Sequence, residues 1–218
     1  MPAKRNITNI TLKAKSNGET GRQYQRVVGL LKSKGLVRPR ELARHGITRS
    51  VLQRMSERGE IERVRRGLYA LPGAITSEHQ SLIEASKRVP SGVMCLLSAL
   101  SFHGIGTQLP HEVWIAIDRK TRRPTIEYPP LRIVRFSGQA LTYGIEEHVI
   151  DGVAVRVTNP AKTIADCFKY RNKIGLDVAL EALREGWRGH RVTMDQLFKA
   201  ARVCRVERVI RPYAEALV

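Results

Sequence analysis

Apolar residues recur every three or four positions across residues 23–58, a spacing that is typical of amphipathic helices. The pattern predicts a helix over residues 23–34, a second helix that begins at Pro39 and a third helix from Thr48 to about Arg58. Glycines separate these helices, and the Thr48 hydroxyl is expected to cap the third one. Three residues of the third helix are expected to face the core: Val51, Leu52 and Met55.

A short β-hairpin is expected to follow the third helix. Residues 60–65 alternate between polar and apolar, Arg66-Gly67 has the composition of a turn, and residues 68–71 form the return strand. The order helix, turn, helix, hairpin predicts a winged helix-turn-helix domain over residues 21–72, bounded by Pro72-Gly73. Residues 1–20 are polar, and we interpret them as a flexible basic tail.

Residues 73–218 combine helical and strand patterns, and they predict a mixed α+β domain with a largely antiparallel sheet. The Asp151-Gly152 pair is a strong signal for a tight hairpin between two strands. Asn159-Pro160 opens a helix, and Gly186 is expected to end another. The expected strands lie at 113–117, 131–136, 145–149 and 153–157, and the expected helices at 77–89, 93–103, 160–170, 176–185, from Thr193 onward and at 205–217.

The charge of the chain is strongly positive and unevenly distributed. Lys and Arg number 38 against 20 Asp and Glu, which gives a formal net charge of +18. Residues 1–72 hold 17 basic and 5 acidic side chains and so carry +12 of that charge. Such a domain attracts polyanions, of which duplex DNA and RNA are the usual ones. Charge alone would serve ribosomal or membrane-surface binding equally well, so the helix-turn-helix pattern decides for DNA.

Composition also indicates the compartment. The sequence has no apolar run of about 20 residues and no apolar segment after its basic N-terminus, so we expect neither a membrane span nor a secretory signal. Cys95, Cys167 and Cys204 are far apart and odd in number, which favours reduced core residues over a disulfide framework or a zinc site. We therefore expect a cytoplasmic protein.

The predicted DNA-binding residues fall into three groups. Base edges suit the residues that turn outward from the third helix, because Arg can bind guanine and Gln can bind adenine: Arg49, Ser50, Gln53 and Arg54. Phosphates suit Arg40, Arg44 and Arg58. The adjacent minor groove suits arginines of the hairpin: Arg63, Arg65 and Arg66. The alternative is a module of the same shape that contacts proteins, with its arginines merely solvated.

Several segments of the sequence resemble the AbiEi family, the antitoxins of type IV toxin–antitoxin systems associated with abortive phage infection. The segments are RGLYALPG at 66–73, LLSALSFHGIGTQLPHEVWIAID at 96–118 and NPAKTIADCFKYRNKIGLDVALEALREG at 159–186. The resemblance implies a winged helix that represses the operon's own promoter by binding repeats. It also implies a C-terminal domain that counters a nucleotidyltransferase-like toxin, without the need for a stable complex.

The resemblance carries over no individual antitoxicity residue. The candidate antitoxicity surface is therefore a basic cluster that follows a predicted strand, although a solvated loop would have the same composition: Arg119, Lys120, Arg122 and Arg123. The alternative function is a general winged-helix transcription regulator whose C-terminal domain senses a ligand or dimerises.

Catalysis, metal binding and cofactor binding are not expected. The six histidines form no ligand pair at helical spacing, and Gly104-Ile105-Gly106 lacks the third glycine of a dinucleotide loop. His103 and His111 flank this loop and could approach each other, for which a structural role is expected. Asp118, Lys120 and Glu127 loosely suggest a metal-dependent nuclease, but the next strand offers Leu131-Arg132-Ile133 in place of an acid and a lysine.

Overall fold

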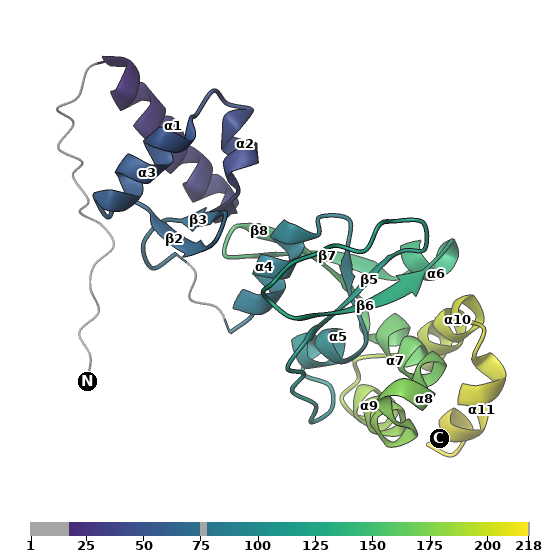
Figure 1. The fold of residues 1–218 in the computed structure, drawn as a ribbon. Coiled ribbons are helices and arrows are strands. Elements are labelled where there is room, and N and C mark those ends of the chain that lie inside the picture. The colour runs from purple at the N-terminus through teal and green to yellow at the C-terminus, as the bar shows by residue number, and fades with distance from the viewer. Residues whose placement is uncertain (1–17, 75–77, 218) are drawn as a thin grey trace, which may run out of the picture. The chain divides into compact units, whose positions relative to one another are not determined.

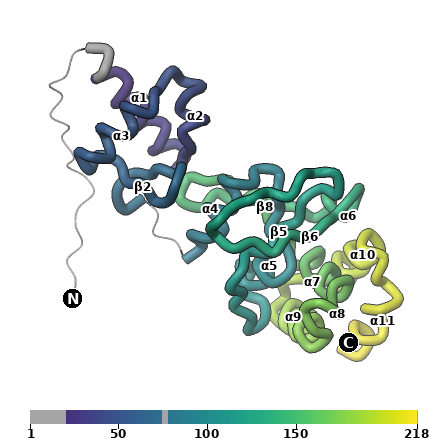
Figure 2. The backbone as a smooth tube through the Cα atoms, viewed as in Figure 1, coloured from purple at the N-terminus to yellow at the C-terminus, as the bar shows by residue number. Residues whose placement is uncertain are grey.

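The computed structural model describes residues 18–74 and 78–217 (Figure 1). The chain divides into two compact units, Met1–Ala74 and Ile75–Val218, and the backbone path through each can be followed in Figure 2. The interpretation of residues 1–17 as a flexible tail lies outside the described residues. Residues 18–20, which were assigned to the same tail, lie instead in the first helix.

The first unit contains three helices and three short strands. The helix from residue 23 was predicted too short, because the observed helix begins at Gly18 and adds more than a turn at its N-terminal end. The two helices after it begin where the sequence pattern places them. In chain order the elements are α1 Gly18–Lys34, β1 Leu36–Val37, α2 Pro39–Ala43, α3 Arg49–Glu57, β2 Glu62–Arg65 and β3 Leu68–Ala70.

The three strands form an antiparallel sheet in the order β1-β3-β2. Strand β1 was not expected from the pattern, because its two residues Leu36 and Val37 are too few to alternate; they pair with Ala70 and Tyr69 of β3. One core joins α1, α2 and α3 to this sheet. Its fully buried members include Val27 of α1, Leu42 of α2 and Met55 of α3, each completely inaccessible to solvent.

The second unit is a five-stranded sheet with helices, in strand order β6-β5-β4-β8-β7. The predicted Asp151-Gly152 hairpin is observed, and both residues have the positive φ that such a turn requires (47° and 75°). In chain order the elements are α4 Gln80–Arg88, β4 Val93–Met94, α5 Leu96–His103, β5 Val113–Asp118, β6 Leu131–Phe136, α6 Gln139–Thr142, β7 Ile145–Ile150, β8 Val153–Thr158, α7 Pro160–Lys169, α8 Arg171–Ile174, α9 Leu176–Arg188, α10 Met194–Cys204 and α11 Glu207–Glu215.

The expectation of a largely antiparallel sheet is wrong, because two of its four pairings are parallel, β4 with β8 and β5 with β6. The β4–β8 pairing was missed because Val93 and Met94 read as the start of a buried helix. They form instead the central strand β4, and α5 begins only at Leu96. A fully buried apolar run has no polar alternation, so periodicity cannot separate a short central strand from a buried helix.

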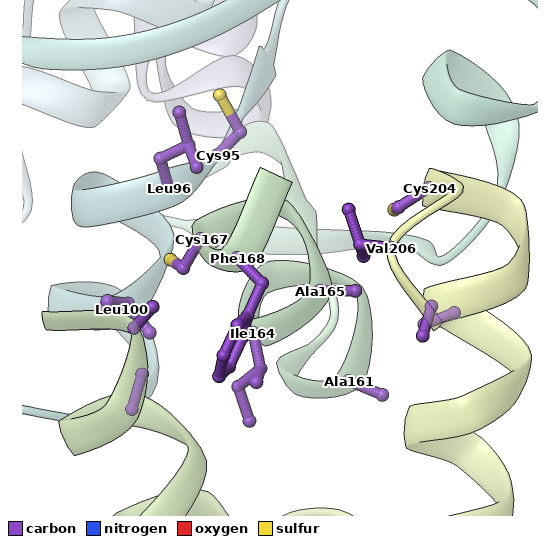
Figure 3. Close-up of a cluster of buried hydrophobic side chains, with 14 of the residues drawn as sticks. Cys95, Leu96, Leu100, Ala161, Ile164, Ala165, Cys167, Phe168, Cys204 and Val206 are labelled. Carbon is purple, nitrogen blue, oxygen red and sulfur yellow. The ribbon is translucent and has the colours of Figure 1, made fainter. Parts of the chain in front are cut away.

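The core of the second unit lies between the sheet and a helical bundle (Figure 1). Helix α7 is at its centre, and Figure 3 shows Ile164, Ala165 and Phe168 of this helix among apolar side chains from α5 and the C-terminal helices. Gly186 does not end α9 as predicted. The helix continues to Arg188, and Gly186 is buried where an added Cβ would lie 2.6 Å from the Cδ1 atom of Ile164.

Candidate nucleic-acid interface

The turn between α2 and α3 is short and closed by backbone hydrogen bonds. The N–H of Gly46 donates to the carbonyl of Ala43 at 3.0 Å, and the N–H of Ile47 donates to Leu42 at 3.2 Å. Gly46 has a φ of +71°, a conformation that L-residues with a side chain adopt only with strain. Ile47 is 3% exposed and fills the space beneath the turn, so the angle between the two helices is held by apolar packing.

Helix α3 has one apolar face and one polar face. Val51, Leu52 and Met55 are buried, as expected. Arginine and glutamine side chains occupy the opposite face near the N-terminus of the helix. All ten residues predicted to contact DNA are exposed in the structure: Arg40, Arg44, Arg49, Ser50, Gln53, Arg54, Arg58, Arg63, Arg65 and Arg66.

Several of these side chains have partners within the first unit. The Gln53 amide donates from Nε2 to Oε1 of Glu57 at 3.0 Å, and the Nε atom of Arg54 donates to the carbonyl of Ser50 at 3.3 Å. Thr48 occupies the N-cap position, but its hydroxyl does not bind a free backbone N–H as expected. It lies 2.9 Å from the Ser50 hydroxyl instead, so the first turn of α3 keeps N–H groups that this threonine does not satisfy.

The β2–β3 hairpin presents the other arginines. Arg63 and Arg65 lie on β2, and Arg66 lies in the turn beside Gly67, which has a φ of +74°. The register shifts between Arg63 and Arg65, because Arg63 pairs with Tyr69 whereas Arg65 pairs with Leu68. A bulge of this kind increases the local twist and re-aims the side chains next to it.

The structure brings together two arginines that the sequence pattern could not relate. Arg40 of α2 and Arg49 of α3 line one depression of about 410 Å³ between the two helices, whose floor includes Ala43, Gly46 and Ile47. The N-terminal turn of α3 opens beside it, with the partial positive charge of a helix N-terminus. The depression therefore presents two guanidinium groups next to a helix end, an arrangement that favours phosphate.

The basic cluster of the second unit lies in the loop between β5 and β6. All four of its side chains are exposed: Arg119, Lys120, Arg122 and Arg123. The loop backbone is fixed by Arg135 of β6, whose Nη1 atom donates to the carbonyls of Asp118 at 3.0 Å, of Arg119 at 3.3 Å and of Thr121. Asp118 accepts the N–H of Lys120 at 2.7 Å, so its carboxylate closes the turn.

A buried polar cluster in α7 was missed by the sequence reasoning. Lys162 and Asp166 are both fully inaccessible to solvent, and the Lys162 Nζ atom lies 2.5 Å from Oδ2 of Asp166. The Cys204 thiol donates to Oδ1 of the same carboxylate at 3.2 Å, and Nζ lies 4.6 Å from the centre of the Phe136 ring. Burial raises the pKa of Asp166, while the nearby Lys162 opposes that shift. The sequence signal that could have predicted this pair is a lysine and an aspartate four positions apart within an otherwise apolar helix.

The two histidines beside the Gly104-Ile105-Gly106 loop have separate surroundings. The His103 Nε2 atom lies 2.7 Å from the carbonyl of Thr158, to which it donates in the matching tautomer, whereas His111 is exposed. Burial lowers the pKa of His103, so its ring is neutral at pH 7. Among the described residues, no group of three or more His, Cys, Asp or Glu side chains is arranged to hold a metal ion.

No helix within residues 18–74 and 78–217 is long and apolar enough to cross a bilayer.

The fold of the chain is shared with a solved protein, the RV2827C protein from Mycobacterium tuberculosis. Its crystal structure superposes with a TM-score of 0.55 at 14% sequence identity, and the alignment covers 89% of this chain and 81% of that one. At this identity the likeness concerns the fold alone.

A family model matches part of the first unit. Residues 25–72 match the model of a family described as a transcriptional regulator, the AbiEi antitoxin. The resemblance inferred from the sequence is therefore confirmed over this segment, which contains α2, α3 and the β2–β3 hairpin. No curated protein matches the chain.

Proposed function

We propose that this protein is the antitoxin and transcriptional autorepressor of a type IV toxin–antitoxin operon. In this proposal α2, α3 and the β2–β3 hairpin act as a winged helix-turn-helix that binds repeats in the operon's own promoter. The second unit counters a nucleotidyltransferase-like toxin encoded in the same operon. The protein acts in the cytoplasm, and neither catalysis nor a cofactor is part of the proposal.

The observation that carries the DNA-binding part is the polarity of α3. One face of this helix is buried through Val51, Leu52 and Met55, so the helix cannot turn its exposed face away from a ligand without leaving the core. That exposed face holds Arg49 and Arg54, and exposed arginines recur on the β2–β3 hairpin. The match of residues 25–72 to AbiEi transcriptional regulators supports the same interpretation.

The proposal divides the work among the exposed residues. Base edges in the major groove are contacted by the N-terminal half of α3: Arg49, Ser50, Gln53 and Arg54. Phosphates are contacted by Arg40, which lines the depression beside the start of α3, and by Arg44 and Arg58. The hairpin arginines Arg63, Arg65 and Arg66 enter the minor groove. Because Gln53 is hydrogen-bonded to Glu57, it must exchange that bond to read adenine.

The antitoxin part rests on the second unit and on the sequence segments that resemble the family. We assign the loop Arg119–Arg123 as its functional surface, because Arg135 holds the loop backbone in one conformation while the four cationic side chains remain exposed. Reversing these charges (Arg119→Glu, Lys120→Glu, Arg122→Glu, Arg123→Glu) should abolish protection of cells that express the neighbouring toxin. Protection at the parental level would remove this loop from the proposal.

The test of autorepression is fluorescence anisotropy with the operon's own upstream DNA and with a scrambled duplex, at two salt concentrations. A specific repressor should prefer the upstream DNA by about 10³-fold or more and keep that preference at the higher salt. Equal and steeply salt-sensitive affinity for both duplexes would mean that the +18 charge acts without regard to sequence. The first unit would then need a different partner.

A further inference from the structure

The two end strands of the five-stranded sheet carry opposite charges. Strand β6 holds Arg132 and Arg135 and no acidic residue, whereas β7 holds Glu146 and Glu147 and no Lys or Arg, and all four side chains are exposed. Among the described residues, neither strand pairs with a further strand on its outer side. An unpaired edge presents backbone N–H and C=O groups that another strand can bind.

The outer side of β6 is open. A groove of about 540 Å³ is lined by residues 132–135 of β6, by Trp114 of β5 and by Tyr170 and Lys173. Successive side chains of a strand point to opposite faces, so four consecutive residues can line one groove only along the edge of the strand. None of the residues that line the groove is acidic. The edge of β6 is therefore accessible and bordered by cations.

The two arginines of β6 can accept new partners. Arg132 forms an ion pair with Glu112 at 3.2 Å, but 59% of its side chain remains exposed, and exposed pairs of this kind are weak. The hydrogen bonds that hold Arg135 to the β5–β6 loop use its Nη1 atom, so its other N–H donors can reach a carboxylate.

The acidic edge is equally accessible. Val149 of β7 is 75% exposed, which shows that this side of the strand is not covered. Glu146 lies 3.4 Å from the His148 ring, with 47% of its side chain exposed, and Glu147 lies opposite Arg156 of β8 in the sheet. Carboxylates in such exposed contacts can accept a further cation.

The two end strands run in the same direction. Strand β6 is parallel to β5, β5 is antiparallel to β4, β4 is parallel to β8, and β8 is antiparallel to β7. Two reversals leave β6 and β7 pointing the same way, and each strand has six residues. A second copy in the same orientation can therefore add its β6 to β7 as a parallel strand, so that one sheet continues through both copies.

The charges also match face by face. Paired residues have their side chains on the same face of a sheet, and following the pairs across the sheet places Arg135 on the face of Glu146. By the same construction Arg132 is on the face of Glu147. A register that sets Glu146 opposite Ile133 of the next copy makes each carboxylate the diagonal neighbour of one arginine, within reach of long side chains.

We propose that copies of this chain associate head to tail through their sheet edges, with β7 of one copy against β6 of the next. Glu146 contacts Arg135 of the next copy, and Glu147 contacts Arg132. Pairing of β6 with β6 would set arginines beside arginines, and pairing of β7 with β7 would set glutamates beside glutamates, so the charges disfavour both symmetric contacts. A head-to-tail contact leaves a free edge at each end, so the assembly grows with concentration.

The test is sedimentation equilibrium of the full chain, freed of nucleic acid, over a range of concentrations at low and at high salt. The average mass should rise above the 24.6 kDa of one chain at low salt and fall back at high salt, because exposed ion pairs are screened. Charges on edge strands also serve in proteins to keep sheets apart. If that were their only role here, the mass would stay at one chain throughout, and the proposal would be overturned.

Two charge reversals identify the edges. Arg132→Glu and Glu147→Arg should each weaken association by about tenfold, because each replaces an attraction by a repulsion. An equal mixture of the two variants should associate again, since every altered edge then meets the opposite charge on the other variant. Arg135 is not a suitable target, because its side chain also holds the β5–β6 loop.

The matched control is Lys199→Glu, which changes the net charge by the same amount as Arg132→Glu but lies on α10, away from both edges. It should associate like the parent, and all variants should keep the parental unfolding temperature. Equal losses in Arg132→Glu and Lys199→Glu, a mixture that stays monomeric, or an assembly that stops at two copies would each overturn the proposal. No DNA or toxin is present in these measurements, so their outcome is independent of the autorepression test.

Discussion

Helices α3 and α7 differ in the burial of their charged residues. Helix α3 buries three apolar residues and leaves its arginines in solvent, where they can exchange water for a polyanion. Helix α7 buries eight consecutive residues, Ala161–Phe168, and these include the Lys162–Asp166 pair. The exposed arginines of α3 therefore remain accessible to a charged ligand, whereas the buried pair of α7 is satisfied within the core.

The largest effect on stability is expected for Lys162→Met. The substitution leaves Asp166 buried without its cation, and breaking a buried pair in this way costs about 3–5 kcal/mol of the free energy of unfolding. Chemical denaturation measures the loss. It should be greater at pH 8 than at pH 5, because protonation neutralises Asp166 at low pH once Lys162 is absent.

The control for Lys162→Met is the double variant Lys162→Met/Asp166→Leu. It replaces the pair by apolar side chains of similar volume and should recover most of the lost stability. A loss of less than about 1 kcal/mol in the single variant would show that the cluster does not depend on its charges.

The next substitutions test DNA binding by the exposed arginines of α3 and of the hairpin. Arg54→Ala should cost about 1–3 kcal/mol of binding free energy with the upstream DNA and relax the preference for that DNA over the scrambled duplex. Its stability should change by no more than about 0.5 kcal/mol, because Arg54 is exposed. Arg66→Ala should instead weaken binding to both duplexes alike and reduce the salt slope by about one. Equal effects of the two substitutions on both duplexes would contradict the division of roles.

A smaller effect is expected where α9 packs against α7. Gly186→Ala places a Cβ 2.6 Å from Cδ1 of Ile164, a contact that forces the isoleucine to move. Overpacking of this kind costs about 1–3 kcal/mol, from which the better helix propensity of alanine recovers up to about 1 kcal/mol. Adding Ile164→Val removes the Cδ1 atom, and it should be less destabilising in the Gly186→Ala background than in the parent. Identical costs in both backgrounds, measured by thermal unfolding, would contradict the contact.

The smallest effect concerns His103, whose ring donates to the Thr158 carbonyl just before α7. Burial lowers the pKa of this histidine, so the unfolded chain binds a proton at a higher pH than the folded chain does. The stability that the neutral ring contributes is therefore present above the ordinary pKa of about 6.5 and is lost as the pH falls below it. His103→Gln should have a shallower decline in stability between pH 7 and pH 5 than the parent, by urea denaturation. Parallel pH profiles would exclude this role.

Local chemistry made much of the structure predictable. Glycine and proline positions predicted the starts and ends of α2, α3 and the β2–β3 hairpin, and Asp151-Gly152 predicted the hairpin of the second unit. Exposure of the predicted DNA-binding residues of α3 also followed from helix periodicity. The β4 strand could not be predicted, because its two residues form a strand only through partners at Ile115, Ala116 and Val157. Likewise, the depression beside Arg40 depends on residues that are brought together by folding.

The pairing of the short strand β4 with β8 also determines when the sheet of the second unit can form during synthesis of the chain. Its parallel partner β8 ends at Thr158, so the five-stranded sheet cannot close until Thr158 has left the ribosome. The three-stranded sheet of the first unit is complete at Ala70, and every one of its strand pairings joins residues of that unit. Domains generally fold as units during translation, N-terminal first. A nascent chain would thus present the arginine-bearing face of α3 well before the second unit has taken its final form.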